Sequence, residues 1–205
     1  KIVKKFNPQI TIGVGGYASG PTILAAKILK IPSILQEQNS FPGKTNKILS
    51  KSANKICVAY NGLEQFFPKR KIILTGNPIR KNMIEIVGKE IEGYKFYDFD
   101  SKRKTILILG GSLGARTLNE SVIEKIEELR LTNVQILWQC GKLYYKKLID
   151  ELKNINLGKI KMVKFINRMD LAYAIADVVI SRAGAISVSE LCLVKKPTIL
   201  VPSPN

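Results

Sequence analysis

Two glycine clusters, each lying between a short apolar strand and a helix, constrain the fold of this chain more than any other feature. The first cluster spans residues 13–16 and the second spans residues 110–114. Such a turn occurs where a buried strand of a parallel sheet leads into the helix that crosses back over the sheet. The sequence therefore predicts an α/β protein with two Rossmann-like parallel-sheet domains.

Strands and helices are expected to alternate through both halves of the chain. The apolar runs predict strands at residues 9–12, 33–35, 55–59, 71–75, 105–109, 134–138, 161–165, 178–180 and 198–201. The periodic stretches predict helices at residues 22–30, 43–52, 117–130, 144–153, 169–176 and 187–194. We expect an N-terminal domain at residues 1–80, a charged linker at 81–103 and a C-terminal domain at 104–205. Ligands should bind at the carboxyl ends of the strands.

The first glycine cluster has two interpretations. Its backbone N–H groups can bind phosphate at the start of a helix, or its glycines can simply allow a tight turn. Gly13, Gly15 and Ala18 also match the dinucleotide pattern G-x-G-x-x-G/A. Glu37 follows at the distance of a ribose-binding acid, so an NAD-type oxidoreductase is the main alternative function. The Ser-Gly-Pro sequence at residues 19–21 counts against it, because proline belongs in the first turn and should delay this helix.

A third candidate site is the segment 181–190, which is rich in small residues and follows an expected strand. The hydroxyls of Ser187 and Ser189, with free N–H groups at the helix start, can bind a phosphate. The Glu190 carboxylate can accept hydrogen bonds from a sugar diol. The alternative is a capping box, in which Ser187 and Glu190 only cap the helix. A dinucleotide needs only one glycine-rich phosphate-binding turn. The presence of this segment and of the second glycine cluster therefore counts against the oxidoreductase alternative.

The net charge of +17 favours anionic partners, such as an acidic lipid surface or phosphorylated substrates. The alternative is a general enrichment in lysine, since the lysines are spread along the whole chain. The sequence carries no nucleic-acid-binding signature, so we expect no nucleic acid partner. With no histidine and three scattered cysteines, we expect no metal site and reduced thiols. No apolar run approaches the roughly 18 residues needed to cross a bilayer.

Six short motifs follow one another over nearly the whole chain. They are Gly15-Gly16-Tyr17-x-Ser19-x-Pro21, Glu37-Gln38-Asn39, Gly76-Asn77-Pro78-x-Arg80, Gly110-Gly111-Ser112-x-Gly114-Ala115, Phe165-Ile166 and Ser181-Arg182-x-Gly184-Ala185 through Glu190. In this order they resemble the family 28 glycosyltransferases that add N-acetylglucosamine to the lipid-linked muramyl-pentapeptide of the cell wall. The resemblance implies a GT-B architecture, with the donor UDP-N-acetylglucosamine in a cleft between the domains. It also implies an inverting transfer in peptidoglycan synthesis, no cofactor, and a peripheral position on the cytoplasmic face of the bacterial plasma membrane.

The same resemblance implies roles for individual residues. Arg80 and Ser112 would contact the UDP-sugar at its phosphates, and Asn39 would face the sugar near the acceptor. Ile166 would meet the uracil through its backbone, and Glu190 would hold the ribose hydroxyls. The residues that would line the nucleotide are Ala185, Ile186, Ser187, Val188 and Ser189. The loop at Gly15 and Gly16 would help to hold the acceptor diphosphate.

These residues also have purely structural interpretations. Arg80 can be a solvated side chain after a turn, Asn39 can satisfy loop backbone, and Ile166 can face the core. The chain departs from the family pattern at Gln36, where a histidine commonly precedes Glu-Gln-Asn. The family's first glycine-rich loop, with its histidine, and its glutamine-bearing donor segment are not found within these 205 residues. We therefore expect a fragment in which both domains are incomplete, with the catalytic base outside it and no turnover on its own.

Overall fold

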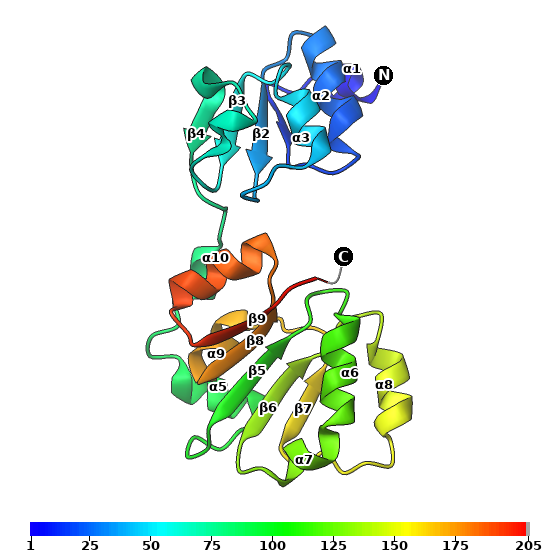
Figure 1. The fold of residues 1–205 in the computed structure, drawn as a ribbon, viewed down its shortest axis with the longest axis vertical. Helices are drawn as coiled ribbons and strands as arrows, with labels where there is room; N and C mark the ends of the chain where they lie inside the picture. The colour runs from blue at the N-terminus through cyan, green and yellow to red at the C-terminus, as the bar shows by residue number, and fades with distance from the viewer. Residues whose placement is uncertain (204–205) are drawn as a thin grey trace. The chain divides into compact units, whose positions relative to one another are not determined.

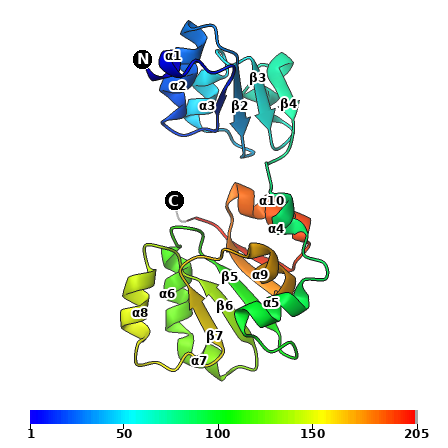
Figure 2. The same ribbon diagram turned by 180° about the vertical axis from the view of Figure 1, so that it is seen from behind.

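The computed structural model of the chain describes residues 1–203. The chain divides into two compact units, Lys1–Pro78 and Ile79–Asn205, which Figures 1 and 2 show from opposite sides. Each unit is built on one parallel sheet, of four strands in the first unit and five in the second. The prediction of an α/β protein with two parallel sheets is confirmed.

The first unit has the strand order β1-β2-β3-β4. Its strands are β1 (Thr11–Gly13), β2 (Ser33–Glu37), β3 (Lys55–Val58) and β4 (Ile72–Leu74). Its helices are α1 (Ile2–Phe6), α2 (Ser19–Ile28) and α3 (Lys44–Leu49), with 3₁₀ turns η1 (Leu63–Gln65) and η2 (Lys69–Lys71). Ile23 of α2 and Leu49 of α3 are buried with Leu35 of β2 in one core. This core fixes the loops that follow β1 and β2.

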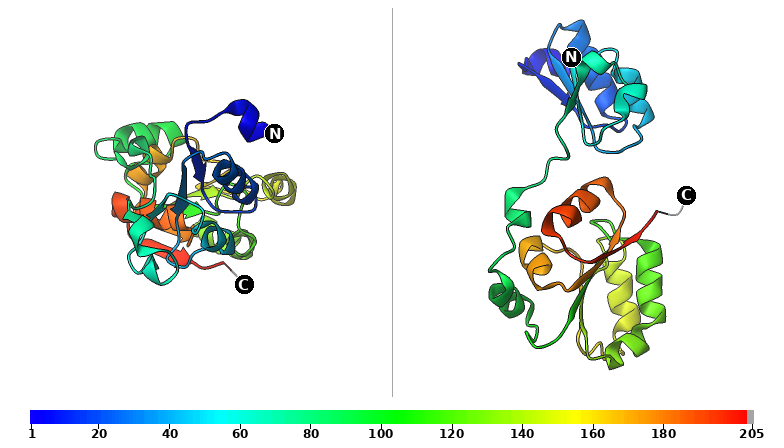
Figure 3. Two further views of the ribbon diagram at one scale, coloured as in Figure 1. Left: turned by 90° about the horizontal axis from the view of Figure 1, so that it is seen from above. Right: turned by 60° about the vertical axis from the view of Figure 1, so that its left-hand side comes forward.

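The second unit has the strand order β7-β6-β5-β8-β9, which is the order of a doubly wound nucleotide-binding sheet. Its strands are β5 (Thr105–Leu109), β6 (Gln135–Gln139), β7 (Ile160–Val163), β8 (Val178–Arg182) and β9 (Thr198–Val201). Its helices are α4 (Lys81–Ile84), α5 (Glu90–Tyr97), α6 (Arg116–Glu124), α7 (Ile126–Leu131), α8 (Tyr145–Leu152), α9 (Met169–Ile175) and α10 (Ala185–Val194). Helices α6 to α8 cover one face of this sheet, and α5, α9 and α10 pack on the other (Figure 3).

The central strands β5 and β6 are buried on both faces, which explains their continuously apolar sequences. Leu107 of β5 belongs to the core beneath α9, whereas its neighbour Ile108 belongs to the core beneath α6. Trp138, the one tryptophan of the sequence, is 0% exposed in the core beneath α6. Its indole N–H donates to Asn119 Oδ1 at 3.1 Å, so the polar edge of the ring is also satisfied.

Helix α2 begins at Ser19, with Pro21 inside its first turn. The prediction that residues 19–21 delay this helix is therefore wrong. The proline ring is accommodated because the first N–H groups of a helix have no acceptor within it. This removes one objection to the dinucleotide interpretation. Whether that interpretation holds then depends on whether Glu37 is accessible to a ribose.

Residues 81–103, where we expected a linker, contain helices α4 and α5. Helix α5 lies directly against α9, since a Cβ at Gly93 would lie 2.5 Å from Cγ2 of Ile175. Only Gly93 and Tyr97 of α5 are buried, so the helix lacks the wide apolar stripe that would identify it in the sequence. The single helix expected at residues 117–130 is divided into α6 and α7 at Lys125.

Candidate functional site

A pocket of about 390 Å³ lies within the second unit, at the carboxyl ends of its strands. Its walls come from the loops after β5 and β7, from the end of β8, and from α9 and α10. Strands β5 and β8 flank the point at which the order of the strands reverses. Open parallel sheets bind ligands at this point, and the volume suits a small molecule.

The pocket brings together residues from well-separated segments of the chain. The predicted donor-site residues that line it are Arg80, Ser112, Ile166, Ser187 and Glu190. Arg80 precedes α4, Ser112 follows β5, and Ile166 follows β7. Val188 lies on another side of α10, where it lines a hollow with Leu191. The predicted residues Ala185, Ile186 and Ser189 lie in the first two turns of the same helix.

The glycines of the turn after β5 differ in their surroundings. Gly114 is closely packed, whereas Gly111 has open space around it. Gly114 has a φ of 99°, and a Cβ there would lie 2.3 Å from the carbonyl oxygen of Cys140. Gly111 has a φ of 82°, but no atom lies within 4 Å of the position its Cβ would take. The tight-packing interpretation therefore holds for Gly114, whereas Gly111 and Ser112 line the pocket.

Glu190 is not part of a capping box. Helix α10 begins at Ala185 with Gly184 as its N-cap, so Ser187 lies inside the helix and cannot cap it. The Oε2 atom of Glu190 instead accepts a hydrogen bond from the Tyr173 hydroxyl at 3.1 Å. Burial raises the pKa of Glu190, and the Tyr173 hydrogen bond and the charge of Arg80 oppose that rise. The capping interpretation is wrong, and the carboxylate lies on the pocket wall.

Hydrogen bonds hold residues 168–170, where α9 begins, to α5 and to its N-cap residue Lys89. Arg168 donates to both carboxylate oxygens of Asp170, each at 3.0 Å, and Lys89 donates to Asp170 Oδ2 at 3.0 Å. The Tyr97 hydroxyl donates to the backbone oxygen of Arg168 at 2.9 Å. Ile166 is only 4% exposed and its side chain packs in the core, although the residue also lines the pocket.

Replacement of Asp170 by asparagine is expected to destabilise the second unit by about 2 kcal/mol at neutral pH. The guanidinium of Arg168, followed by the ammonium of Lys89, holds the pKa of Asp170 well below its usual range. Because this folded pKa lies below the unfolded value of about 3.9, the stabilisation is present above that pH. It should disappear as the pH falls through the folded pKa.

Urea unfolding followed by Trp138 fluorescence across acidic and neutral pH measures this effect. Asp150→Asn, at an exposed position of α8, is the matched control and should change the free energy of unfolding little. A deficit in Asp170→Asn that stays constant at strongly acidic pH would contradict the electrostatic explanation.

Two arginines of the pocket form no salt bridge in the part of the chain that the structure describes. They are Arg80 and Arg182. Arg168, by contrast, is paired with Asp170 and Glu92. Guanidinium groups without a carboxylate partner favour an anionic ligand, because the planar group matches phosphate oxygens.

Gln139, Tyr173 and Arg182 are among the pocket residues to which the sequence assigns no role. Gln139 could have been found, because it directly follows the strand expected at residues 134–138, where a parallel sheet binds ligands. Tyr173 stands in an apolar helix that gives no such signal.

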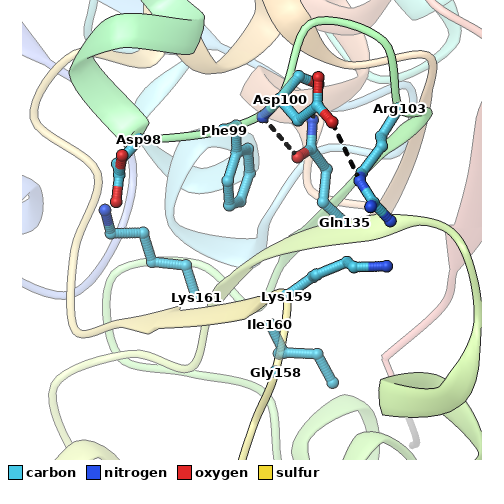
Figure 4. A pocket seen from close by; sticks show the side chains of 9 residues that line it. All are labelled: Asp98, Phe99, Asp100, Arg103, Gln135, Gly158, Lys159, Ile160 and Lys161. Atoms are coloured by element: carbon cyan, nitrogen blue, oxygen red, sulfur yellow. Dashed lines mark hydrogen bonds and ion pairs between the residues drawn. The ribbon is translucent and has the colours of Figure 1, made fainter.

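A second hollow, of about 380 Å³, lies at the amino ends of the same strands. Figure 4 shows that its polar side chains bond to one another: the Asp100 backbone N–H donates to Gln135, and Arg103 donates to the Asp100 carboxylate. Lys161 donates to the backbone oxygen of Tyr97 at 2.7 Å. These mutual contacts leave the hollow with few groups for a ligand.

The predicted residues of the first unit surround a buried carboxylate. Glu37 is 2% exposed and accepts hydrogen bonds at 2.8 to 3.3 Å from the backbone of Asn39 and Gly43 and from the side chains of Asn39 and Asn46. A carboxylate enclosed in this way is not accessible to a ribose. The dinucleotide interpretation therefore lacks the ribose-binding acid that it requires. Asn39 itself is exposed, and Gly15 and Gly16 form the turn after β1.

Comparisons with known proteins agree with these features. The Glycosyltransferase family 28 N-terminal domain matches residues 1–58, and the C-terminal domain of that family matches residues 105–205. A Flavobacterium psychrophilum protein named UDP-N-acetylglucosamine–N-acetylmuramyl-(pentapeptide) pyrophosphoryl-undecaprenol N-acetylglucosamine transferase is 55% identical over 204 residues, covering 100% of this chain and 55% of the relative. The chain spans about half the length of the curated relatives it matches.

Solved structures share the fold of this chain. The crystal structure of Acinetobacter baumannii MurG has a TM-score of 0.67 and 31% identity, covering 99% of this chain and 55% of that protein. A Neisseria meningitidis UDP-GlcNAc 2-epimerase has a TM-score of 0.68 at 16% identity over 97% of this chain and 61% of that protein, which shows a common fold. The GT-B fold expected from the motifs is confirmed. With both domains matched in order and a relative more than half identical, the chain belongs to glycosyltransferase family 28.

Proposed function

We propose that the whole protein transfers N-acetylglucosamine, with inversion, from UDP-N-acetylglucosamine to a lipid-linked muramyl-pentapeptide in peptidoglycan synthesis. The observation that carries the proposal is the pocket of the second unit, where Arg80, Ser112 and Glu190 line one cavity. A carboxylate can accept hydrogen bonds from the ribose diol, and a guanidinium can bind the diphosphate. The relatives are named as N-acetylglucosamine transferases that act on N-acetylmuramyl-(pentapeptide) pyrophosphoryl-undecaprenol, which supports this sugar and this acceptor.

In this proposal the nucleotide spans the pocket from the loop after β7 to α10. The uracil lies against the backbone of Ile166, and the ribose hydroxyls donate to Glu190. The first turns of α10, from Ala185 to Ser189, approach the diphosphate, because the N–H groups of a helix start lack acceptors within the helix. In the first unit, Asn39 contacts the sugar, and the turn at Gly15 and Gly16 helps to bind the acceptor diphosphate.

The reaction is a displacement at the anomeric carbon. The acceptor hydroxyl attacks that carbon and loses its proton to a base, while the bond to the β-phosphate oxygen breaks and UDP leaves with the electron pair. Negative charge therefore develops on the departing diphosphate. Arg80 and the start of α10 stabilise this charge, and one donor placed in this way contributes about 3 kcal/mol to lowering a barrier.

Titration calorimetry with UDP, UDP-N-acetylglucosamine and NAD tests the donor part of the proposal on the 205-residue chain. We expect both uridine nucleotides to bind and NAD not to bind. Binding of NAD without binding of UDP would support the oxidoreductase alternative instead.

Glu190→Gln is expected to weaken UDP binding about tenfold or more, because hydrogen bonds to a charged group contribute about 1.5–3 kcal/mol. Burial raises the pKa of Glu190, so wild-type affinity should fall as the pH drops through a value above the usual 4.3 or so. The variant should lack this pH dependence, since an amide does not titrate. Glu151→Gln, at an exposed position of α8, is the control. Unchanged UDP affinity in Glu190→Gln would exclude the ligand role.

We also propose that the protein binds the cytoplasmic surface of the bacterial plasma membrane, where a lipid-linked acceptor is within reach. Helix α1 carries Ile2 and Phe6, which are 84% and 80% exposed, together with Lys4 and Lys5. Ile28, at the end of α2, is 82% exposed, and α1 lies beside α2 (Figures 1 and 2). Apolar side chains flanked by lysines suit the headgroup region of an anionic bilayer. Among the described residues, no helix is long and apolar enough to cross a membrane.

Vesicle sedimentation should show binding to anionic vesicles that weakens as salt rises, because each lysine near the surface gains about 1 kcal/mol and salt screens this gain. The double variant Phe6→Ser with Ile28→Ser should bind less. Val87→Ser, at a position 94% exposed in the second unit, should bind like the wild type. Equal binding to anionic and neutral vesicles would contradict the electrostatic part of the proposal.

A further inference from the structure

Tyr173 lines the pocket next to Glu190. Its side chain is 0% exposed and belongs to the core beneath α9, with Leu107 and Leu191. Its hydroxyl lies 3.1 Å from Oε2 of Glu190. An ionised carboxylate can only accept hydrogen bonds, so the tyrosine hydroxyl is the donor. Tyr173 can therefore influence a ligand through Glu190.

The two partners of this hydrogen bond differ in rigidity. The Tyr173 ring is enclosed by the core, and α9 is anchored one turn earlier, where Asp170 meets Arg168 and Lys89. Glu190 is only half-buried and has three rotatable side-chain bonds. Its Oε1 atom has no hydrogen-bond partner in the part of the chain that the structure describes. The rigid phenol therefore holds a flexible carboxylate at one oxygen and leaves the other for the pocket.

We infer that Tyr173 is a positioning residue that presets the Glu190 carboxylate for a vicinal diol, so that the site prefers ribonucleotides to 2′-deoxyribonucleotides. This inference rests on the proposed binding of UDP-sugar in this pocket. A diol presents two O–H donors, and both reach one carboxylate only when the plane of that carboxylate is correctly oriented. A preset side chain loses no rotamer freedom on binding, an advantage of about three- to tenfold in affinity.

The same hydrogen bond influences the titration of Glu190. Burial raises the pKa of Glu190, whereas the hydrogen bond from Tyr173 on α9 and the charge of Arg80 before α4 lower it. The other charged groups that line the pocket are Arg168, Asp170 and Arg182. These groups stay unchanged when the tyrosine hydroxyl is removed. UDP affinity should then fall at a higher pH in Tyr173→Phe than in the wild type, because the carboxylate has lost a donor that favours its charged form.

Calorimetry of the full chain with UDP and with 2′-deoxy-UDP, from neutral to mildly acidic pH, tests this inference. Tyr173→Phe should weaken UDP about three- to tenfold and 2′-deoxy-UDP much less, with the acid midpoint moved upward. Thr105→Val is the control, since it removes another buried hydroxyl, one that accepts from Gln135 Nε2 at 2.9 Å at the other end of β5. It should change neither the ratio of the two affinities nor the midpoint. In the Glu190→Gln background, Tyr173→Phe should have no further effect.

The outcomes separate this inference from the proposed function. If the wild type binds UDP and Tyr173→Phe keeps the same ratio and midpoint, Tyr173 is not a positioning residue and the donor site stands. If the wild type does not bind UDP, both are overturned. Should Tyr173→Phe melt far below Thr105→Val, 3-fluorotyrosine at position 173 replaces it, as a stronger donor of nearly the same size. It should move the acid midpoint downward, and an unchanged midpoint would count against the inference.

Discussion

Gly141→Ala is expected to destabilise the second unit strongly, by about 3–5 kcal/mol. Gly141 follows β6 with a φ of 86°, and a Cβ there would lie 2.1 Å from the backbone nitrogen of Gly114 and 2.2 Å from its Cα. Gly114 follows β5, and a Cβ added there would lie 2.3 Å from the carbonyl oxygen of Cys140. The clash is between two main chains fixed by neighbouring strands, so no side chain can turn away to relieve it. Backbone strain and overpacking together should cost on the order of 3–5 kcal/mol, against a typical total of about 5–15 kcal/mol.

Urea unfolding followed by Trp138 fluorescence measures this loss, because the one tryptophan of the sequence is buried in the second unit. Gly111→Ala is the matched control. Gly111 has a similar φ of 82° but no atom within 4 Å of its would-be Cβ, so the strain of positive φ alone should cost about 1–2 kcal/mol. Equal losses in the two variants would show that close packing at Gly141 contributes nothing.

Glu37→Ala is expected to destabilise the first unit by about 3 kcal/mol or more. The carboxylate of Glu37 is the acceptor for donors on Asn39, Gly43 and Asn46, and it is 2% exposed. Removing it takes the acceptor from all of these donors, of which the Asn46 side chain is itself buried, and a buried donor without an acceptor costs about 1–3 kcal/mol unless water replaces the carboxylate. The loop from β2 to α3, which carries Asn39, should loosen at the same time.

Amide hydrogen exchange read by mass spectrometry locates the effect of Glu37→Ala. Exchange should accelerate over residues 33–49, which hold β2, the loop and α3. Glu64→Ala removes an exposed carboxylate of the same unit and should leave exchange in this segment unchanged. Wild-type protection over residues 33–49 in Glu37→Ala would mean that the hydrogen bonds of Glu37 do not hold the loop.

The strands could be predicted because each is a short apolar run that is bounded by polar or turn-forming residues. The expected strands at residues 105–109 and 198–201 coincide with β5 and β9, and the glycine turns lie where those patterns placed them. Of the residues expected to bind the donor, Ser112 and Ile166 lie in the loops that follow β5 and β7, at the carboxyl ends of the strands, as the topology of a parallel sheet predicts. Helix α5 was not predicted because it buries only a glycine and a tyrosine, which leaves no periodic apolar pattern in the sequence.

The contacts that shape the pocket could not be predicted. Ser187 and Glu190 have the spacing of a capping box, but the same spacing occurs inside a helix, and only the start of α10 at Ala185 decides between them. Tyr173 meets Glu190 across 17 positions of sequence, and Lys89 meets Asp170 across 81. Such pairs depend on which elements become neighbours, which no local pattern encodes.

Product analysis of UDP-N-acetylglucosamine turnover tests the proposed transfer most directly, using a chain extended to the length of the curated relatives. With a lipid-linked muramyl-pentapeptide present, we expect UDP and a β-linked N-acetylglucosamine product to form together in equal amounts. Without the acceptor, the nucleotide sugar should remain intact. Formation of its C2 epimer without any acceptor, the reaction named for the UDP-GlcNAc 2-epimerases that share this fold, would contradict the transferase function. So would consumption of the donor with no sugar on the lipid.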